Sequence, residues 1–260
     1  MFYRNPPDRF HKETPLPAEI IVPSAGEKKH VTVLISDLSG FTVLSQRLDP
    51  EELNELMGGI FGAMDKIISA FGGFIEKFMG DAVVAFFGVP AAHEDDPVRA
   101  VFAALDIHQA IASLRPQPRT ASGLPLRMHS GISSGLVVTT TFNPTRGNYG
   151  ISGDTINLAA RLQALAQPGD ILVCADTRRQ SEGYFAFESL PPARVKGRSQ
   201  LVAIHRVISA RAHPRKLYPR RGLRSRLIGR RQEMRLLFEA ADRLQAGTGS
   251  VIGICGEAGT

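Results

Sequence analysis

The sequence of 260 residues contains no tryptophan and only two cysteines, Cys174 and Cys255. Both cysteines lie in short apolar runs typical of buried strands, which argues against a disulfide-stabilised fold and against a zinc site built from thiolates. No apolar run approaches the roughly 20 residues that a membrane-spanning helix needs. The first residues also lack the apolar core of a signal peptide. We therefore expect a cytoplasmic protein with reduced thiols and no membrane span.

Positive charge is concentrated in one segment of the chain. The net charge is +6, yet residues 206–235 hold eleven Lys or Arg and a single acidic residue, so the remainder is slightly acidic. Such a segment can attract nucleic acid or anionic lipid. Pro214, Pro219 and Gly222, together with the lack of regularly interleaved aromatic residues, favour an interdomain linker. We expect no specific binding to nucleic acid.

Composition and periodicity divide the chain into four parts. Residues 1–29 are rich in proline and aperiodic, which predicts a tail or linker. Residues 30–207 alternate between apolar strands and helical patterns and are predicted to form the main domain. Residues 208–226 form the basic linker, and residues 227–260 are predicted to begin a second domain.

The predicted elements of the main domain follow the order β-α-β-β-α-β, with a further α/β extension. This order predicts an α+β fold with a ferredoxin-like core, in which an antiparallel sheet carries helices on one face. The other face would be partly open, and an open apolar face suggests a partner subunit. The predicted core elements are a strand at 31–36, one or two helices at 40–70, a hairpin at 74–87, a helix ending near 114 and a strand at 126–138. The extension is predicted to contain a helix at 155–165 and strands at 170–174 and 201–207.

Two aspartates follow the ends of predicted strands. Asp37 comes directly after the strand at 31–36, and Asp81 follows Gly80 in the predicted hairpin. Each aspartate alone is typical of a turn or a helix cap. Two carboxylates held at strand ends can, however, share divalent cations. The pair indicates metal-assisted phosphoryl chemistry on a nucleotide.

Three further polar residues are candidates for the same chemistry. Lys77 lies four residues before Asp81, and a strand lysine is usually just solvated. Asn157 and Arg161 are one turn apart on a predicted helix, so they share one face. The two could form a structural hydrogen-bond pair, or they could reach a cleft and neutralise charge on a transferring phosphoryl group. Asp154, at the start of this helix, is predicted to be its N-cap.

These segments together resemble the catalytic domain of class III nucleotidyl cyclases over roughly residues 30–207. Four motifs in the expected order carry the resemblance: SDLSGFT at 36–42, EKFMGD at 76–81, GDTINLAARL at 153–162 and VKG at 195–197. The resemblance implies conversion of ATP to cyclic AMP and pyrophosphate, with two Mg²⁺ or Mn²⁺ ions at each site. It also implies a homodimer with two symmetric sites.

The resemblance assigns roles to the residues of one subunit. Asp37 and Asp81 match the ligands of the two metal ions, and Lys77 matches the lysine that selects the purine. The turn that follows Asp37 leads into a helix, whose first N–H groups suit phosphate oxygens. The substrate-binding residues expected in this turn are Gly40, Phe41 and Thr42.

The second subunit is expected to complete the site. Asn157 and Arg161 match the pair that stabilises the transition state, with the asparagine positioning the ribose and the arginine contacting phosphate. Lys196 matches a phosphate-binding lysine. In the family the metal ligands and the purine-selecting lysine come from one subunit, and the Asn–Arg pair comes from the other.

Gly150 departs from the family pattern. Family members usually carry Asp or Thr at this position, where the side chain contacts the purine. Base selection would then rest on Lys77, which favours adenine, whereas guanylyl members carry Glu at that position. Glu76 is one residue out of register, on the opposite face of the predicted strand. We expect ATP as substrate; the alternatives are a guanylate cyclase and a weakly active or inactive cyclase-like domain that binds nucleotide or dimerises.

The C-terminal segment resembles the start of the NTPase domain that often follows such cyclase domains in large bacterial regulators. Residues 227–237 are predicted to begin a helix. Residues 251–260 resemble a strand running into a P-loop, without the Gly-Lys-Ser/Thr that completes the motif. We expect a fragment of a longer signalling protein, in which the NTPase would report another signal to the cyclase.

Overall fold

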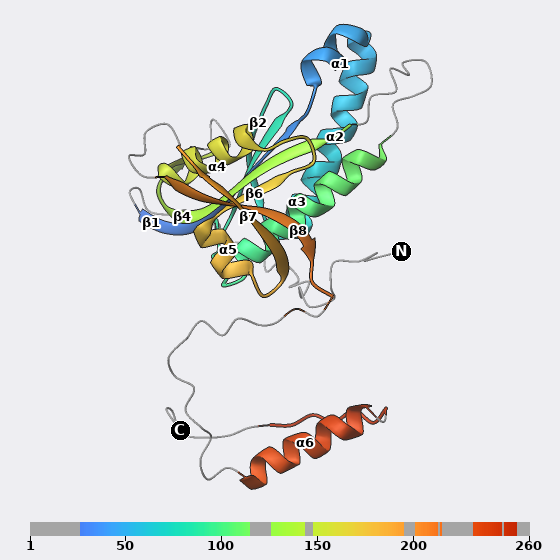
Figure 1. Cartoon of the computed structure of the whole chain (residues 1–260), viewed down its shortest axis with the longest axis vertical. Helices are drawn as coiled ribbons and strands as arrows, with labels where there is room; N and C mark the ends of the chain where they lie inside the picture. The colour runs from blue at the N-terminus through green and yellow to red at the C-terminus, as the bar shows by residue number, and fades with distance from the viewer. Residues whose placement is uncertain are drawn as a thin grey trace. The chain divides into compact units, whose positions relative to one another are not determined.

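The computed structural model describes residues 27–114, 126–143, 148–194, 201–212, 214, 231–245 and 247–253. The chain divides into two compact units, Met1–Leu217 and Tyr218–Thr260. The first unit contains the sheet and helices α1 to α5, and the second contains α6 (Figure 1).

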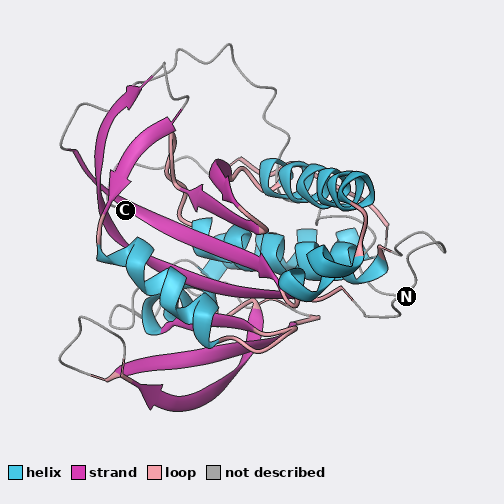
Figure 2. Cartoon of the chain, turned by 90° about the horizontal axis from the view of Figure 1, so that it is seen from above, coloured by secondary structure: helices cyan, strands magenta, loops and turns pink. Residues whose placement is uncertain are grey.

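One sheet of eight strands organises the first unit (Figure 2). The strand order is β2-β3-β1-β4-β6-β8-β7, and β5 pairs with β4 outside this path. Strands β4 and β6 run parallel, and every other pairing described in the sheet is antiparallel. The strands are β1 (Glu27–Leu38), β2 (Phe74–Met79), β3 (Ala82–Phe87), β4 (Met128–Asn143), β5 (Asn148–Ser152), β6 (Ile171–Cys174), β7 (Phe185–Ala193) and β8 (Val202–Ala210).

The first four strands confirm the ferredoxin-like core. Their order β2-β3-β1-β4 places the two central strands of a βαββαβ unit side by side, as the sequence predicts. The helices are α1 (Phe41–Arg47), α2 (Pro50–Ala70), α3 (Asp96–Ser113), α4 (Asp154–Leu165), α5 (Ala175–Ser181) and α6 (Arg231–Gln245).

Helices cover both faces of the sheet. On one face, Leu34 of β1 shares a core with residues of α2 and α3, including Ile60 and Ile107. Val33 and Ile35 point to the other face, because side chains alternate along a strand, and they share a separate core with residues that include Ala159 of α4. The prediction of helices on one face of the sheet is therefore correct for the βαββαβ core. The face expected to be open is partly covered by α4, which comes from the extension.

A capping box closes the N-terminus of α2. The Asp49 side chain accepts a hydrogen bond from the Glu51 N–H at 3.0 Å, and Glu52 completes a capping box by bonding back to Asp49. Pro50 occupies the first turn, where its missing N–H costs nothing. The strong cap fixes where the chain leaves the α1 turn and enters the core helix.

Several local predictions differ from the structure. Asp154 is the first residue of α4, and Gly153 is its N-cap, with no side-chain cap hydrogen bond. Strand β4 runs to Asn143, past the predicted end at 138, and there it pairs with β5. Strands β5 and β7 and helix α5 were not predicted. α5 spans 7 residues, and the exposure of β7 follows no clean alternation, so neither carries a strong periodic signal.

The second unit contains α6, which begins close to the predicted helix. Leu236 and Phe238 on this helix are 64% and 63% exposed. Residues 251–253, predicted to begin a strand, have no regular secondary structure, and the rest of the proposed P-loop lies outside the described residues. Within the ranges described above, no helix is long and apolar enough to cross a membrane.

Candidate functional site

The antiparallel register of β1 and β3 brings Asp37 and Asp81 to the same end of the sheet. Ser36 of β1 pairs with Val83 of β3. Asp37 follows Ser36, and Asp81 precedes Val83 by two residues in the turn between β2 and β3. The two carboxylates, 44 residues apart in the sequence, are therefore neighbours in the fold.

The two carboxylates influence each other directly. The pKa of Asp81 is raised to about 6, first because burial disfavours its charged form and then because Asp37 hydrogen-bonds to it and adds a like charge. Mg²⁺ and Mn²⁺ prefer oxygen ligands such as these two carboxylates. A bound cation would also offset the repulsion between them. In the described part of the chain no group of three or more His, Cys, Asp or Glu forms a complete metal cage. Two carboxylates nevertheless fit Mg²⁺, which usually takes its other ligands from water and substrate phosphates.

Asp37 lies in a network of polar contacts that the sequence did not indicate. His129 of β4 pairs across the sheet with Asp37, and its Nε2 lies 3.8 Å from Asp37 Oδ2. Gln163 of α4 donates from Nε2 to Asp37 Oδ2 at 3.1 Å. The other carboxylate oxygen, Oδ1, accepts from the Leu38 N–H at 3.0 Å. A titratable residue on a buried strand could have drawn attention to His129, but nothing in the sequence places Gln163 here.

The turn after Asp37 leads directly into α1, as predicted. Gly40 has a φ of 79°, a left-handed conformation that glycine adopts without strain, and it is the N-cap of α1. The first turn of α1 contains no acidic residue. Phe41 is partly buried against the main core, and Thr42 is exposed. These three predicted substrate-binding residues thus follow Asp37 closely in the sequence and form the start of α1.

Lys77 lies on β2, the strand that enters the Asp81 turn, and is exposed. The pairing of β2 with β3 shifts register between Ile75 and Lys77, so Glu76 occupies a bulge. The bulge breaks the simple alternation that placed Glu76 on the face opposite to Lys77. The surroundings of Glu76 and Lys77 still differ. Glu76 is partly buried, its Oε2 has no hydrogen-bond partner, and burial raises its pKa while the Lys77 charge lowers it.

The residues expected from a second subunit do not bond to the aspartates of their own chain. Asn157 is exposed and Arg161 partly buried on α4. Within the described ranges, no hydrogen bond or ion pair joins either side chain to Asp37 or Asp81. Gly150 is exposed on β5, and Lys196 lies outside the described residues.

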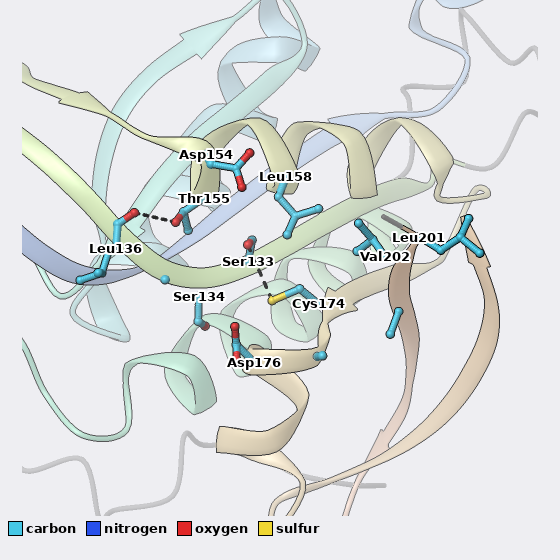
Figure 3. A pocket seen from close by; sticks show the side chains of 13 residues that line it. Ser133, Ser134, Leu136, Asp154, Thr155, Leu158, Cys174, Asp176, Leu201 and Val202 are labelled. Atoms are coloured by element: carbon cyan, nitrogen blue, oxygen red, sulfur yellow. Dashed lines mark hydrogen bonds between the residues drawn. The ribbon is translucent and has the colours of Figure 1, made fainter. Parts of the chain in front are cut away.

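A pocket of about 640 Å³ lies between β4, the start of α4, the start of α5 and the start of β8 (Figure 3). None of the predicted site residues lines it. Its buried polar groups bond to one another or to the backbone: Thr155 Oγ1 donates to the Leu136 carbonyl at 2.8 Å, and Ser133 Oγ donates to Cys174 Sγ at 3.7 Å. These buried groups are therefore satisfied within the fold, and the exposed carboxylates of Asp154 and Asp176 supply the charge on the pocket's lining.

Comparison with known families gives one match that covers most of the chain. Residues 24–207 match the family described as the adenylate and guanylate cyclase catalytic domain. This range contains every residue of the Asp37–Asp81 region and all of α4.

Solved structures with a similar fold include enzymes of both substrate types. The adenylyl cyclase CyaB from P. aeruginosa is 35% identical, with a TM-score of 0.67, and the match covers 72% of this chain and 97% of that one. The guanylyl cyclase Cya2 is 32% identical, with a TM-score of 0.63, and the match covers 75% of this chain and 97% of that one.

Among curated proteins, Adenylate cyclase 1 of Rhizobium meliloti is 29% identical over 188 residues. That match covers 71% of this chain but only 28% of the relative, so the chain spans less than a third of the length of this relative. An uncharacterised protein of the same organism, R02095, is 29% identical over 90% of this chain and 22% of its own length.

Proposed function

The chain belongs to the adenylate and guanylate cyclase catalytic domain family, and on this premise we propose that it converts ATP to 3′,5′-cyclic AMP and pyrophosphate. The observation that carries the proposal is the Asp37–Asp81 carboxylate pair at one end of the sheet, beside the turn that enters α1. Lys77, on the strand leading to Asp81, supports adenine as the base.

Asp37 and Asp81 would hold two Mg²⁺ or Mn²⁺ ions. When bound, such ions lower the pKa of the ribose 3′-hydroxyl and neutralise phosphate charge. The 3′-oxygen would then attack the α-phosphorus and pass its proton to solvent, while the bond from the α-phosphorus to the bridging oxygen breaks and pyrophosphate leaves. The chain's own part is to hold the two carboxylates together and to present the Gly40–Phe41–Thr42 turn to the phosphates.

We propose that the active form is a homodimer with shared sites. Asn157 would position the ribose, while Arg161 and Lys196 would offset charge on the phosphates in the partner's site. The lack of a hydrogen bond or ion pair from Asn157 and Arg161 to the aspartates of their own chain, within the described residues, supports this arrangement.

GTP is the second candidate substrate. Solved relatives include both adenylyl and guanylyl cyclases. Glu76 supplies a specific observation in favour of guanine, because its Oε2 lacks a hydrogen-bond partner and adjoins Lys77. Gly150 has no side chain to contact the purine, so discrimination would rest on the β2 bulge.

The test is to incubate the purified chain with ATP or GTP and with Mg²⁺ or Mn²⁺, and to identify the cyclic product by mass spectrometry. We expect cyclic AMP to form faster than cyclic GMP, and Asp37→Ala to abolish both. Equal rates with ATP and GTP would refute the choice of substrate. No cyclic product under any condition would favour a cyclase-like domain that only binds nucleotide or dimerises.

We also propose that residues 227–260 begin a P-loop NTPase domain. The separate unit at Tyr218–Thr260 and the Gly256 and Gly259 spacing support it. The match of 90% of this chain to only 22% of R02095 fits a module shared with larger proteins. A gene encoding Gly-Lys-Ser or Gly-Lys-Thr directly after Thr260 would bear this out, and any other continuation would refute it.

A further inference from the structure

Gln163 contacts a metal-ligand candidate, yet none of the four cyclase motifs contains it. Its Nε2 donates to Asp37 Oδ2 at 3.1 Å and lies 2.7 Å from His129 Nε2. We propose that Gln163 is a positioning residue that fixes the Asp37 carboxylate of its own subunit, and that it does so from the helix that serves the partner's site. This inference rests on the proposed function.

The partners around His129 explain why the amide can hold Asp37. Ser39 Oγ lies 2.9 Å from His129 Nδ1. A neutral imidazole with its proton on Nδ1 donates to Ser39 and accepts at Nε2 from Gln163, which leaves the second amide hydrogen for Asp37. Both hydrogens of the Gln163 amide are then used. An aliphatic side chain of the same length would lose both bonds.

Asp37 is thus held at both of its oxygens. Oδ1 accepts from the Leu38 N–H and Oδ2 accepts from Gln163. These bonds fix the rotation of the carboxylate and leave its remaining lone pairs for a cation. Groups that orient a metal-binding carboxylate in this way typically change metal affinity or activity by about 10–100-fold when removed.

The main chain of Gln163 is itself fixed by the sheet. A Cβ added at Gly131 of β4 would meet the backbone of α4 at Ala159 O and Gln163 N. Helix α4 therefore rests directly on β4 at this point, and the Gln163 side chain starts from a backbone position that packing determines.

Helix α4 presents different faces to the two sites. Gln163 follows Arg161 by two residues, which places it about 200° around the helix from the arginine. Asn157 and Arg161 share another face, and in the described part of the chain neither bonds to Asp37 or Asp81. In the proposed dimer, one rigid helix would therefore connect Asp37 of one site with Arg161 of the other.

The first test measures metal binding without nucleotide. Gln163→Met keeps the side-chain length and helix propensity, and it removes both hydrogen bonds. We expect Mn²⁺ affinity, measured by electron paramagnetic resonance of the free ion, to fall about tenfold or more. Both proteins are compared well below their thermal midpoints, because the loss of two hydrogen bonds also lowers stability. The imidazole ¹⁵N signals of His129 should also shift. Gln109→Met, at an exposed position of α3, is the matched control and should change neither readout.

The second test asks which subunit Gln163 serves. Mixed dimers of an Asp37→Ala chain and an Arg161→Ala chain, purified with two tags, contain one complete site. That site uses Asp37 of the Arg161→Ala chain. Gln163→Met in that chain should lower turnover about tenfold more than Gln163→Met in the Asp37→Ala chain.

Equal losses in the two placements, or an unchanged Mn²⁺ affinity in Gln163→Met, would overturn the inference. A mixed dimer that is inactive before any change at Gln163 would instead refute the shared site of the proposed function. In that case the Mn²⁺ affinity and the His129 signals still decide whether Gln163 positions Asp37.

Discussion

At the scale of single residues, the candidate site places two like charges together. Asp81 has a pKa raised to about 6 from an ordinary value of 3.8. The folded protein therefore holds this proton more tightly than the unfolded chain does. As the pH rises from about 4 to about 6 this contribution to stability is lost, and above pH 6 the ionised pair destabilises the metal-free fold. Such strain is typical of functional sites.

Asp81→Asn should relieve this repulsion. We expect the metal-free variant at pH 7.5 to be more stable to urea than the wild type, by on the order of 0.5 kcal/mol because solvent screens a partly exposed group. Cyclase activity should be lost, since a metal carboxylate is gone. Asp65→Asn, on the exposed side of α2, is the control and should alter neither property. A variant at position 81 that is both active and no more stable would contradict the role of the pair.

Burial of His108 leads us to expect a second effect of pH on stability, of different origin. Burial lowers its pKa from 6.5 to about 4, and its Nε2 lies 2.7 Å from Ser130 Oγ. Between these two pH values His108 binds a proton in the unfolded chain but not in the folded protein. Stability should therefore fall as the pH is lowered from 6.5 towards 4, by about 3 kcal/mol at most from this residue.

Urea unfolding of wild type and His108→Gln at pH 7 and pH 5 measures this effect. The glutamine amide can still bond to Ser130 but takes up no proton in this range, so the stability of the variant should depend less on pH. His30→Gln, at an exposed position of β1, should keep the wild-type dependence. Parallel pH profiles for wild type and His108→Gln would show that another group is responsible.

At the scale of elements, the contact between β4 and α4 tolerates only glycine at position 131. The Cβ of Gly131→Ala would meet the backbone of Ala159, Leu162 and Gln163, which cannot move aside as a flexible side chain can. We expect a loss of about 1–3 kcal/mol in unfolding free energy, as for other overpacked sites. Gly62→Ala is the matched control, because a Cβ there meets nothing within 4 Å in α2. It should stabilise by up to about 1 kcal/mol. Chemical denaturation of both variants decides the matter, and a Gly131→Ala protein as stable as wild type would disprove the close packing.

The same contact shows what a sequence can and cannot predict here. The strand-end positions of Asp37 and Asp81 were predictable, because short apolar runs and Gly-containing turns are local signals. The α2 cap at Asp49 was predictable for the same reason. The hydrogen bond from Gln163 to Asp37 was not predictable from the sequence. It depends on the register of β1 with β4 and on the close packing of α4 against Gly131. The bulge at Glu76 likewise depends on pairing between strands.

At the scale of the whole molecule, the position of α4 bears on whether one chain can contain a complete active site. Gln163 on this helix holds Asp37, whereas among the described residues neither Asn157 nor Arg161 bonds to the aspartates of the same chain. The sheet face that the sequence left open is partly filled by this helix. A partner would therefore meet α4 and its neighbours rather than bare strands. A single chain would then hold one half of each of two sites.

Dilution tests this division directly. If each site needs two chains, activity per chain should fall as the wild-type protein is diluted below the dissociation constant of its dimer, and the rate should approach the square of the concentration. Adding an excess of the inactive Asp37→Ala chain to dilute wild type should then raise activity, because that chain still supplies Asn157 and Arg161 to wild-type aspartates. The double variant Asp37→Ala/Arg161→Ala should give no such rescue. Activity that stays proportional to concentration at every dilution, with no gain from the Asp37→Ala chain, would mean that one chain carries a complete site.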